Sequence, residues 1–457
     1  MNLEKYQQYS RIARGLEQAD LVLKDARIIN VFTEEIIRGD IAIQDGIIAG
    51  IGSFQGKEER DLGGKYVCPG FIDSHLHLES TLVTPAELVT VASRHGTTTF
   101  IVDPHESANV SGLAGIDYIL EQTEDVKANV YVMMPSCVPA TGIDDNGCTL
   151  TAQDMAPYLN NSRILGLGEV MDSISVVQGD KGMHDKLELF EGRIRDGHAP
   201  FLVEGDLQAY AMAGIATDHE CSFFDYAMRE RRNGLTILIR EGSAARNLEA
   251  LVGGLVQRKM NGEGFCFCTD DKHIEDIQQE GHIDHNVRKA IRLGMNSVSA
   301  IKMATINAAN CYGLKDKGAI APGRQADLLV LSDLVNVEVE DVYYKGQLID
   351  KNENIVIKPC ASELKNTVHV AEFSKEAFHL ESKDGTFPVI LCEEGQITTR
   401  KGTLKASDGP CEFQPDDDYQ KIAVVERHKA TGKIGRGVIG GVWVFGGGLS
   451  SPGSPPP

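Results

Sequence analysis

Apolar and polar positions follow two different patterns along this chain. After a polar helix predicted over residues 1 to about 18, short segments at 19–23, 26–31 and 41–43 alternate apolar and polar residues between Asp-Gly and Gly turns. This pattern is typical of a small β unit. From Val67 onward, apolar runs are followed by stretches in which apolar residues recur every three or four positions. The second pattern predicts parallel strands that alternate with helices.

Eight strand candidates fall in this second region. Helix-like stretches lie between them, for example at 86–95, 113–122, 224–232 and 247–260. Eight such units in about 230 residues have the length of a TIM-type (β/α)8 barrel, in which functional groups lie at the carboxyl ends of the strands. The predicted strands are 70–77, 97–103, 129–134, 163–170, a weak strand that ends at His198, 214–219, 235–240 and 264–270.

The short-strand pattern returns after the barrel, beginning at Lys317. We therefore predict an α/β protein in which residues 1–65 and 316–360 are two parts of one composite β-sandwich around a barrel at 66–315. Residues 361–442 are predicted to form an incomplete C-terminal α+β domain. The low-complexity residues 443–457 are predicted to be a disordered tail.

Charge and cysteine content narrow the class of protein. The 457 residues include 66 acidic and 45 basic side chains, and the net charge of −21 argues against a nucleic-acid partner and favours a small neutral substrate. The ten cysteines form no Cys-x-x-Cys pair, as is typical of thiols in a reducing compartment. Neither a signal peptide nor a membrane-spanning run is recognisable, so a cytoplasmic location without membrane contact is predicted.

Two histidines end the first predicted barrel strand. Side chains two positions apart on a strand point to the same face, so His75 and His77 can bind one ion while Leu76 and Leu78 pack behind them. The alternative is a pair of hydrogen-bonded polar residues on a half-exposed strand. The other strand ends decide between these two interpretations.

Four other strand ends offer metal-binding side chains. Taken singly, each is more often a capping or hydrogen-bonded polar residue. Taken together with the histidine pair they predict a mixed nitrogen and oxygen site for two divalent ions, with the glutamate placed to bridge them. The four are Glu169 after strand four, His198 after strand five, His219 after strand six and Asp270 after strand eight.

Several motifs resemble the adenine deaminase family of the amidohydrolase superfamily. The broad signal is Pro-Gly-Phe-Ile-Asp-Ser-His-Leu-His at 69–77 with Gly-Ala-Ile-Ala-Pro-Gly-Arg-Gln-Ala-Asp at 318–327, and the narrower matches lie at 102–106, 166–171, 196–200, 217–220, 240–243 and 268–273. The resemblance implies an aminohydrolase of purine salvage that converts adenine to hypoxanthine and ammonia with a metal-bound hydroxide. A homodimer is one assembly that it allows.

The same resemblance implies a binuclear manganese or iron centre, with zinc less expected. It assigns the metal ligands to His75, His77, Glu169, His198, His219 and Asp270. Hydantoinase-like and dihydroorotase-like relatives use a carboxylated lysine after strand four. Glu169 stands there in this chain, which favours the deaminase.

Deamination at C6 of a purine requires proton transfers as well as a nucleophile. Asp270 is the candidate that moves a proton from water to the departing amine, and Glu106 and Asp103 are candidates for protonating the ring nitrogen and positioning the base. His105, Arg240 and Ser243 are candidates for lining the substrate pocket. The alternatives are a strand-to-loop cap at 103–106 and a salt-bridged supporting role for Arg240.

Two other functions remain open from the residues. One is a different amidohydrolase reaction on a cyclic or acyl amide, and the other is a non-catalytic scaffold or purine-binding protein. His282 and His285 look like a further metal pair but are interpreted as helix-cap and packing residues. Family members normally continue through a His-Asp-Ser-His-Asn block, so a truncated or frame-shifted carboxyl end is expected here.

Overall fold

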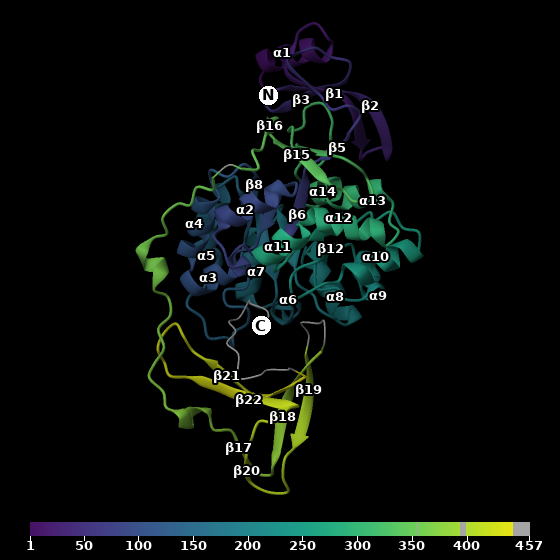
Figure 1. Ribbon diagram of the computed structural model, residues 1–457. Coiled ribbons are helices and arrows are strands. Elements are labelled where there is room, and N and C mark those ends of the chain that lie inside the picture. The colour runs from purple at the N-terminus through teal and green to yellow at the C-terminus, as the bar shows by residue number, and fades with distance from the viewer. Residues whose placement is uncertain (353, 394–398, 442–457) are drawn as a thin grey trace.

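The computed structural model describes residues 1–352, 354–393 and 399–441. An N-terminal sheet lies at one end of the molecule, a barrel lies in the middle, and a C-terminal sheet lies at the other end (Figure 1). The predicted disordered tail at 443–457 lies outside the described residues.

Eight parallel strands form the central barrel. They comprise a five-stranded sheet from β6 to β10 and a three-stranded sheet from β11 to β13. The first sheet is joined to the second at both edges, because the Ala216 amide donates to the Arg195 carbonyl (2.9 Å) and the Asp270 amide donates to the His75 carbonyl (3.0 Å). The predicted (β/α)8 barrel is therefore confirmed. Its strands are β6 (Phe71–Leu76), β7 (Thr97–Val102), β8 (Asn129–Met134), β9 (Ile164–Val170), β10 (Ile194–Gly197), β11 (Thr217–Asp218), β12 (Thr236–Arg240) and β13 (Phe265–Cys268).

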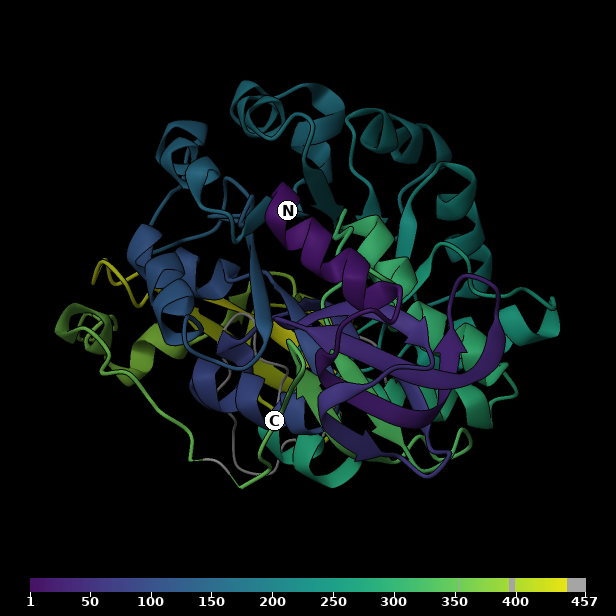
Figure 2. The same cartoon turned by 90° about the horizontal axis from the view of Figure 1, so that it is seen from above.

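Helices surround the barrel (Figure 2). Local sequence sets where they begin: α2 starts after Thr84, whose hydroxyl and backbone exchange hydrogen bonds with Glu87 in a capping box behind Pro85. The helices of this region are α2 (Pro85–Arg94), α3 (His105–Ser111), α4 (Leu113–Gln122), α5 (Ala152–Met155), α6 (Ser173–Gln178), α7 (Lys181–Leu189), α8 (Glu204–Met212), α9 (Phe224–Arg232), α10 (Leu248–Gln257), α11 (Ile274–Glu280), α12 (Ile283–Arg292), α13 (Ser297–Met303) and α14 (Ile306–Cys311).

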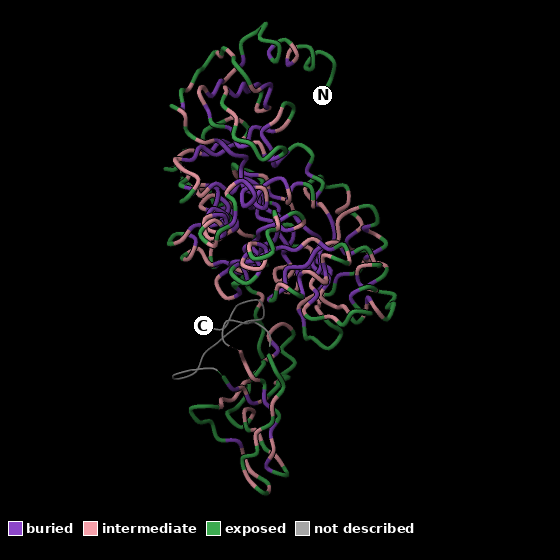
Figure 3. Tube along the Cα trace, turned by 90° about the vertical axis from the view of Figure 1, so that its right-hand side faces the viewer, coloured by how far each residue is buried: buried purple, intermediate pink, exposed green. Residues whose placement is uncertain are grey.

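Apolar burial concentrates in the barrel and its junction with the N-terminal sheet (Figure 3). Every residue of β6 and β7 is buried, as expected for parallel strands covered on both faces. Ile72, Ile101, Met133 and Leu238 contribute to a cluster shared by several barrel strands. Larger apolar clusters lie between the strands and the surrounding helices. This packing holds the strand ends rigidly enough to carry a site.

The N-terminal sheet combines two segments that are far apart in the sequence. Strand β14 pairs antiparallel with β5, so the order is β16-β15-β14-β5-β1-β2-β3, with β4 paired to β1. Helix α1 (Leu3–Ala13) precedes this sheet. Its strands are β1 (Ala19–Asn30), β2 (Glu35–Gln44), β3 (Ile47–Gly52), β4 (Gly56–Asp61), β5 (Tyr66–Pro69), β14 (Leu328–Leu331), β15 (Val339–Tyr344) and β16 (Gln347–Leu348).

The C-terminal region is a small β structure around Phe387, Val389, Phe413 and Val438. Two 3-10 helices, Ser362–Lys365 and Lys375–Phe378, supply its helical part in the described residues. The main sheet has the order β19-β18-β22-β21. The strands are β17 (Glu381–Ser382), β18 (Thr386–Cys392), β19 (Thr399–Lys405), β20 (Cys411–Glu412), β21 (Tyr419–Val425) and β22 (Ile434–Gly440).

Among the described residues, no helix combines the length and the apolar composition needed to cross a bilayer.

Candidate metal centre

His75 and His77 lie buried at the end of β6, with their side chains directed to a common point. Their Nε2 atoms are 3.2 Å apart. The Nδ1 atom of His77 lies 2.7 Å from the Asp103 carbonyl, which can only accept, so Nδ1 carries a proton, and in the neutral imidazole Nε2 is the atom that carries the lone pair. Two imidazole nitrogens that face each other at this distance in a buried site are a suitable arrangement for a shared cation.

Glu169 lies between two sets of histidines. Its Oε1 atom is 2.9 Å from Nδ1 of His105 and 3.5 Å from Nε2 of His77. Its Oε2 atom is 2.9 Å from Nδ1 of His198 and 3.3 Å from Nε2 of His219. Since each oxygen faces different partners, the carboxylate has the geometry of a bridge between two cations.

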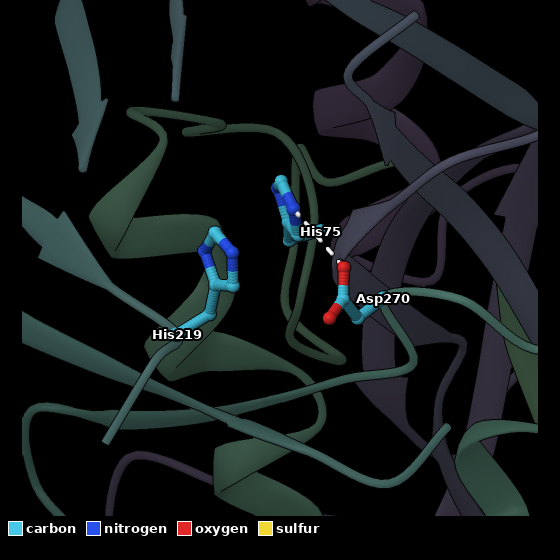
Figure 4. Close-up of side chains that lie close together, drawn as sticks. All are labelled: His75, His219 and Asp270. Atoms are coloured by element: carbon cyan, nitrogen blue, oxygen red, sulfur yellow. Dashed lines mark ion pairs between the residues drawn. The ribbon is translucent and has the colours of Figure 1, made fainter. Parts of the chain in front are cut away.

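Asp270 adds a carboxylate to the group formed by His75 and His77. The backbone leaves β13 after Cys268 and takes a left-handed conformation at Asp270, where φ is 60°. The Oδ1 atom lies 3.2 Å from Nε2 of His77 and 3.6 Å from Nε2 of His75, while Oδ2 accepts a hydrogen bond from Arg240 (2.9 Å). Figure 4 shows His75, His219 and Asp270 grouped around one space.

All six predicted metal ligands lie in overlapping groups whose donor atoms are within 4.8 Å of one another. The Nδ1 atoms of His75 and His219 are buried without a hydrogen-bond partner. Imidazole and carboxylate donors at this spacing fit two divalent cations, with Glu169 shared between them. The groups are His75, His219 and Asp270; His75, His77 and Glu169; and Glu169, His198 and His219.

The three residues predicted after the second strand lie beside this centre. Asp103 is buried, and its Oδ2 atom accepts a hydrogen bond from the Glu169 amide (2.7 Å). His105 contacts Glu169, and Oε2 of Glu106 lies 3.7 Å from Nδ1 of His77. Asp103 therefore holds the backbone of the bridging residue, whereas Oε2 of Glu106 is buried without a hydrogen-bond partner.

Arg240 and Ser243 lie close by but are committed to other protein groups. The Arg240 guanidinium donates two hydrogen bonds to Glu220 (2.5 and 2.9 Å) and one to Asp270. The Ser243 hydroxyl donates to Asp276 (2.5 Å) and accepts from the His273 amide (2.8 Å). This arrangement corresponds to the supporting alternative for Arg240, and the substrate contacts stay predictions.

Glu220 is a site residue to which sequence reasoning assigned no role. It is buried, its Oε1 atom lies 3.6 Å from Nδ1 of His198 and 3.5 Å from Nε2 of His219, and it binds Arg240 through both oxygens. Its position directly after His219 was the available signal. His282, interpreted as a cap, is the N-cap residue of α12, and its Nε2 lies 3.2 Å from Asp73 in the barrel interior.

The pKa values of the carboxyl groups around His77 are shifted in opposite directions. Burial raises the pKa of Glu106 well above its usual range, although His105 and His77 oppose this rise. Burial also acts to raise the pKa of Asp270, but His77 and Arg240 hold it well below its usual range. Burial likewise opposes ionisation of Glu169, and the neighbouring histidines lower its pKa. Two carboxyl groups whose pKa values are shifted apart thus flank one imidazole, a pattern found in acid–base catalysis.

Comparison with known proteins agrees with this geometry. Residues 66–349 match the Amidohydrolase family. An adenine deaminase of Desulfitobacterium hafniense (strain Y51) is 54% identical over 434 residues, which are 94% of this chain and 76% of the relative. An adenine deaminase of Clostridium acetobutylicum is 43% identical over 435 residues, which are 93% of this chain and 76% of the relative.

Solved structures support the fold. An adenine deaminase structure has a TM-score of 0.55 at 17% identity and covers 73% of this chain and 100% of its own. An N-acetyl-D-glucosamine-6-phosphate deacetylase from Mycobacterium smegmatis has a TM-score of 0.56 at 16% identity, with 72% and 100% covered. At these identities the likeness shows the fold alone. With the sequence relatives and the matched domain, it follows that the chain belongs to the adenine deaminase family of amidohydrolases.

Proposed function

We propose that this protein hydrolyses adenine to hypoxanthine and ammonia, as an enzyme of purine salvage. The observation that carries the proposal is the placement of two carboxyl groups on the two sides of the His77 ring. Asp270 lies beside its Nε2 atom and Glu106 beside its Nδ1 atom. Adenine deaminases that share 54% and 43% of their aligned residues with this chain support the choice of substrate.

The chain's own residues perform the proton transfers in this proposal. Against the effect of burial, His77 and Arg240 lower the pKa of Asp270 and so favour its ionised form, whose Oδ1 atom accepts the proton that the attacking water loses and returns it to the departing amine. Burial raises the pKa of Glu106 and so favours its acid form, which donates to the ring nitrogen next to C6. Asp103 keeps Glu169 in place through its amide, and Arg240 directs Oδ1 of Asp270 toward the histidines by binding Oδ2.

Two divalent ions, Mn²⁺ or Fe²⁺ in preference to Zn²⁺, would be held by the six ligands and would supply a nucleophilic water at neutral pH. The mixture of imidazole and carboxylate donors supports this cofactor. In the same proposal His105 and Ser243 line the purine pocket. Ten free cysteines support a reducing cytoplasm as its location, and the homodimer stays a prediction.

Ammonia release from adenine after loading with Mn²⁺ or Fe²⁺ tests the function. The matched variant Asp270→Asn keeps the size of the side chain and removes its charge, and we expect it to release little ammonia. Hydantoins and N-acyl compounds serve as competing substrates. If one of these amides is hydrolysed and adenine releases no ammonia, the protein catalyses a different amidohydrolase reaction. If the chain binds no metal, a non-catalytic scaffold or purine-binding protein is favoured.

A further inference from the structure

Asp218 lies at the end of β11, directly before His219, and is completely buried. Its Oδ1 atom accepts a hydrogen bond from the Ala199 amide (2.6 Å). Its Oδ2 atom accepts hydrogen bonds from the Glu220 amide (2.8 Å) and the Cys221 amide (3.0 Å). A single side chain therefore satisfies three buried backbone donors, each of which would otherwise lose its hydrogen bond.

These donors belong to the two loops that carry the histidines of one cation position. Ala199 follows His198 after β10, and Glu220 and Cys221 follow His219 after β11. Both histidines point at the same Oε2 atom of Glu169. Strand β11 has only two residues, and the ends of β10 and β11 are joined by the Ala216 amide, which donates to the Arg195 carbonyl, and by the Thr217 hydroxyl, which accepts from the Gly197 amide (3.1 Å) and donates to Asp196 (2.9 Å).

Two buried tyrosines hold the far side of the His198 loop. The Tyr210 hydroxyl of α8 donates to the Val170 carbonyl (2.6 Å) and accepts from the His198 amide (2.9 Å). The Tyr226 hydroxyl of α9 donates to the Ala199 carbonyl (2.6 Å) and accepts from the Leu202 amide (2.7 Å). With the loop anchored to α8 and α9, the Asp218 carboxylate joins it to the His219 loop beyond the strand ends, through the Ala199 amide on one side and the Glu220 and Cys221 amides on the other.

We propose that Asp218 is a positioning residue that sets the separation of His198 and His219 and thereby the affinity of the cation position formed by Glu169, His198 and His219. The group of His75, His77 and Glu169 does not depend on these two loops to the same extent, because its ligands lie at the ends of β6 and β9. The proposal rests on the proposed metal-dependent function but needs no statement about the substrate.

The variant Asp218→Asn tests this role. An amide keeps the size of the carboxylate but presents an N–H₂ group to backbone N–H donors on one side, so one of the two loops loses its partner. At limiting free Mn²⁺ we expect the variant to keep about one ion where the parent keeps two. The dissociation constant of the weaker ion should rise by roughly 10–100-fold, as for other residues that orient metal ligands.

Three further measurements separate positioning from other roles. With saturating Mn²⁺, KM for adenine should equal that of the parent, because Asp218 is not assigned a substrate contact. Asp218→Glu keeps the carboxylate, so it should lower the affinity for the same ion less than Asp218→Asn does. If the asparagine variant does not fold, the glutamate variant tests the positioning role. Asp333→Asn is the matched control, since Asp333 also accepts two backbone N–H groups, from Val335 and Asn336, in an exposed loop.

Retention of both ions at parental affinity in Asp218→Asn, or an equal loss of both, would overturn the positioning role. A parent chain that binds two ions but does not deaminate adenine would contradict the proposed substrate and leave the metal measurement decisive for Asp218. A parent chain that binds no ion would overturn the metal centre and the positioning role together.

Discussion

Glu169 is the residue at which the two halves of the candidate centre meet. It is 2% exposed, and its two oxygens face two different pairs of histidines. A buried carboxylate with four imidazole neighbours is stabilised only if its negative charge is balanced by cations, either protonated rings or metal ions. The chemistry of this one side chain therefore links metal binding to the electrostatics of the whole pocket.

Glu169→Gln should abolish most metal binding. The amide offers one acceptor oxygen, and its N–H₂ group would face imidazole nitrogens that must bind the ion. We expect metal affinity to fall by more than the roughly 10–100-fold that is typical when a residue hydrogen-bonded to a metal ligand is lost. Metal analysis after dialysis at fixed free Mn²⁺ measures this loss. Glu58→Gln on the exposed face of β4 is the control. A Glu169→Gln protein that retains both ions would argue against the bridge.

Glu106→Gln should slow the reaction without emptying the site. The amide cannot donate the acid proton, and general acid catalysis typically contributes about 10²–10⁴-fold to the rate. Since burial raises the pKa of Glu106, its acid form is lost as pH rises, so the parent's kcat should fall on the alkaline side. The variant should lack that fall. A parental rate with an unchanged pH profile would exclude Glu106 as the acid.

Glu230 gives a prediction for stability rather than activity. Burial raises its pKa from 4.5 to about 10, and the neighbouring Asp218 adds to the rise. Its stabilising contribution is fully present below about pH 4.5 and is lost as pH rises toward about 10, because the unfolded chain ionises first. The slope is at most about 1.4 kcal/mol per pH unit.

Urea unfolding between about pH 5 and about pH 9 measures this effect. Glu230→Gln stays neutral throughout, so the stability of the parent relative to this variant should decline as pH increases. A constant difference between the two proteins over this range would show that Glu230 has the same proton occupancy in the folded and unfolded chains.

Sequence reasoning placed the candidate ligands at strand ends but did not describe how side chains pair. His75, His77, Glu169, His198 and Asp270 lie at the ends of the first, fourth, fifth and eighth strands of one repeated βα pattern, and a pattern of that kind is visible along the chain. The double hydrogen bond from Arg240 to Glu220 joins two different strand ends. Such a pairing depends on rotamers and packing across the barrel, which residue spacing does not encode.

At the scale of elements, β9 shows how small residues admit a functional side chain. A Cβ atom on Gly168 would lie 2.3 Å from Oδ2 of Asp103, the atom that accepts the hydrogen bond from the Glu169 amide. A Cβ on Gly166 would meet the Ile194 carbonyl at 2.0 Å. Both glycines are therefore required by the close approach of neighbouring strands to β9.

Gly168→Ala should displace Asp103 and loosen the backbone at Glu169. We expect metal affinity to fall by roughly tenfold or more, as when an orienting partner is lost, together with a lower unfolding temperature. Gly253→Ala is the matched control, because a Cβ there meets nothing within 4 Å and Gly253 lies inside α10. That control should stabilise the protein by up to about 1 kcal/mol. Parental metal binding in Gly168→Ala would show that Asp103 can move without consequence.

Element boundaries were predictable where periodicity was strong. The helices predicted at 113–122 and 224–232 have those bounds in the structure. The strand predicted at 214–219 is reduced to Thr217–Asp218. Gly214 has φ of 82°, and its amide bonds the Ala211 carbonyl, so it ends the turn after α8 and does not begin a strand. A helix-ending glycine next to an apolar residue looks like a strand start in the sequence.

At the scale of the molecule, Asp327 joins the N-terminal sheet to the barrel. Its buried carboxylate accepts hydrogen bonds from Asn129 of β8 (2.8 Å), from Gln325 (2.7 Å) and from the Lys345 amide (2.9 Å). The C-terminal sheet is joined to the barrel differently, for example by the exposed ion pair between Lys433 and Asp145 (2.9 Å). Periodicity carries no signal for this second contact, which is why sequence reasoning did not describe it.

Asp327→Ala should destabilise the whole molecule by about 3 kcal/mol, since it leaves several buried donors without an acceptor. Metal content of the folded fraction should stay parental, because Asp327 lies at the opposite ends of the strands from the ligands. Urea unfolding and metal analysis measure the two effects. Asp417→Ala, at an exposed position, is the control. Parental stability of Asp327→Ala would mean that the sheet and the barrel are held together without this residue.

The left-handed backbone at Asp270 restricts the choice of amino acid there independently of chemistry. Asparagine, aspartate and glycine tolerate a φ of 60°, whereas longer and branched side chains are strained by it. A glutamate there would carry this strain, as Glu34 of the same chain does in a turn at a φ of 62°. Asparagine shares the tolerance of this conformation and nearly the size of aspartate, so Asp270→Asn removes the charge without adding backbone strain.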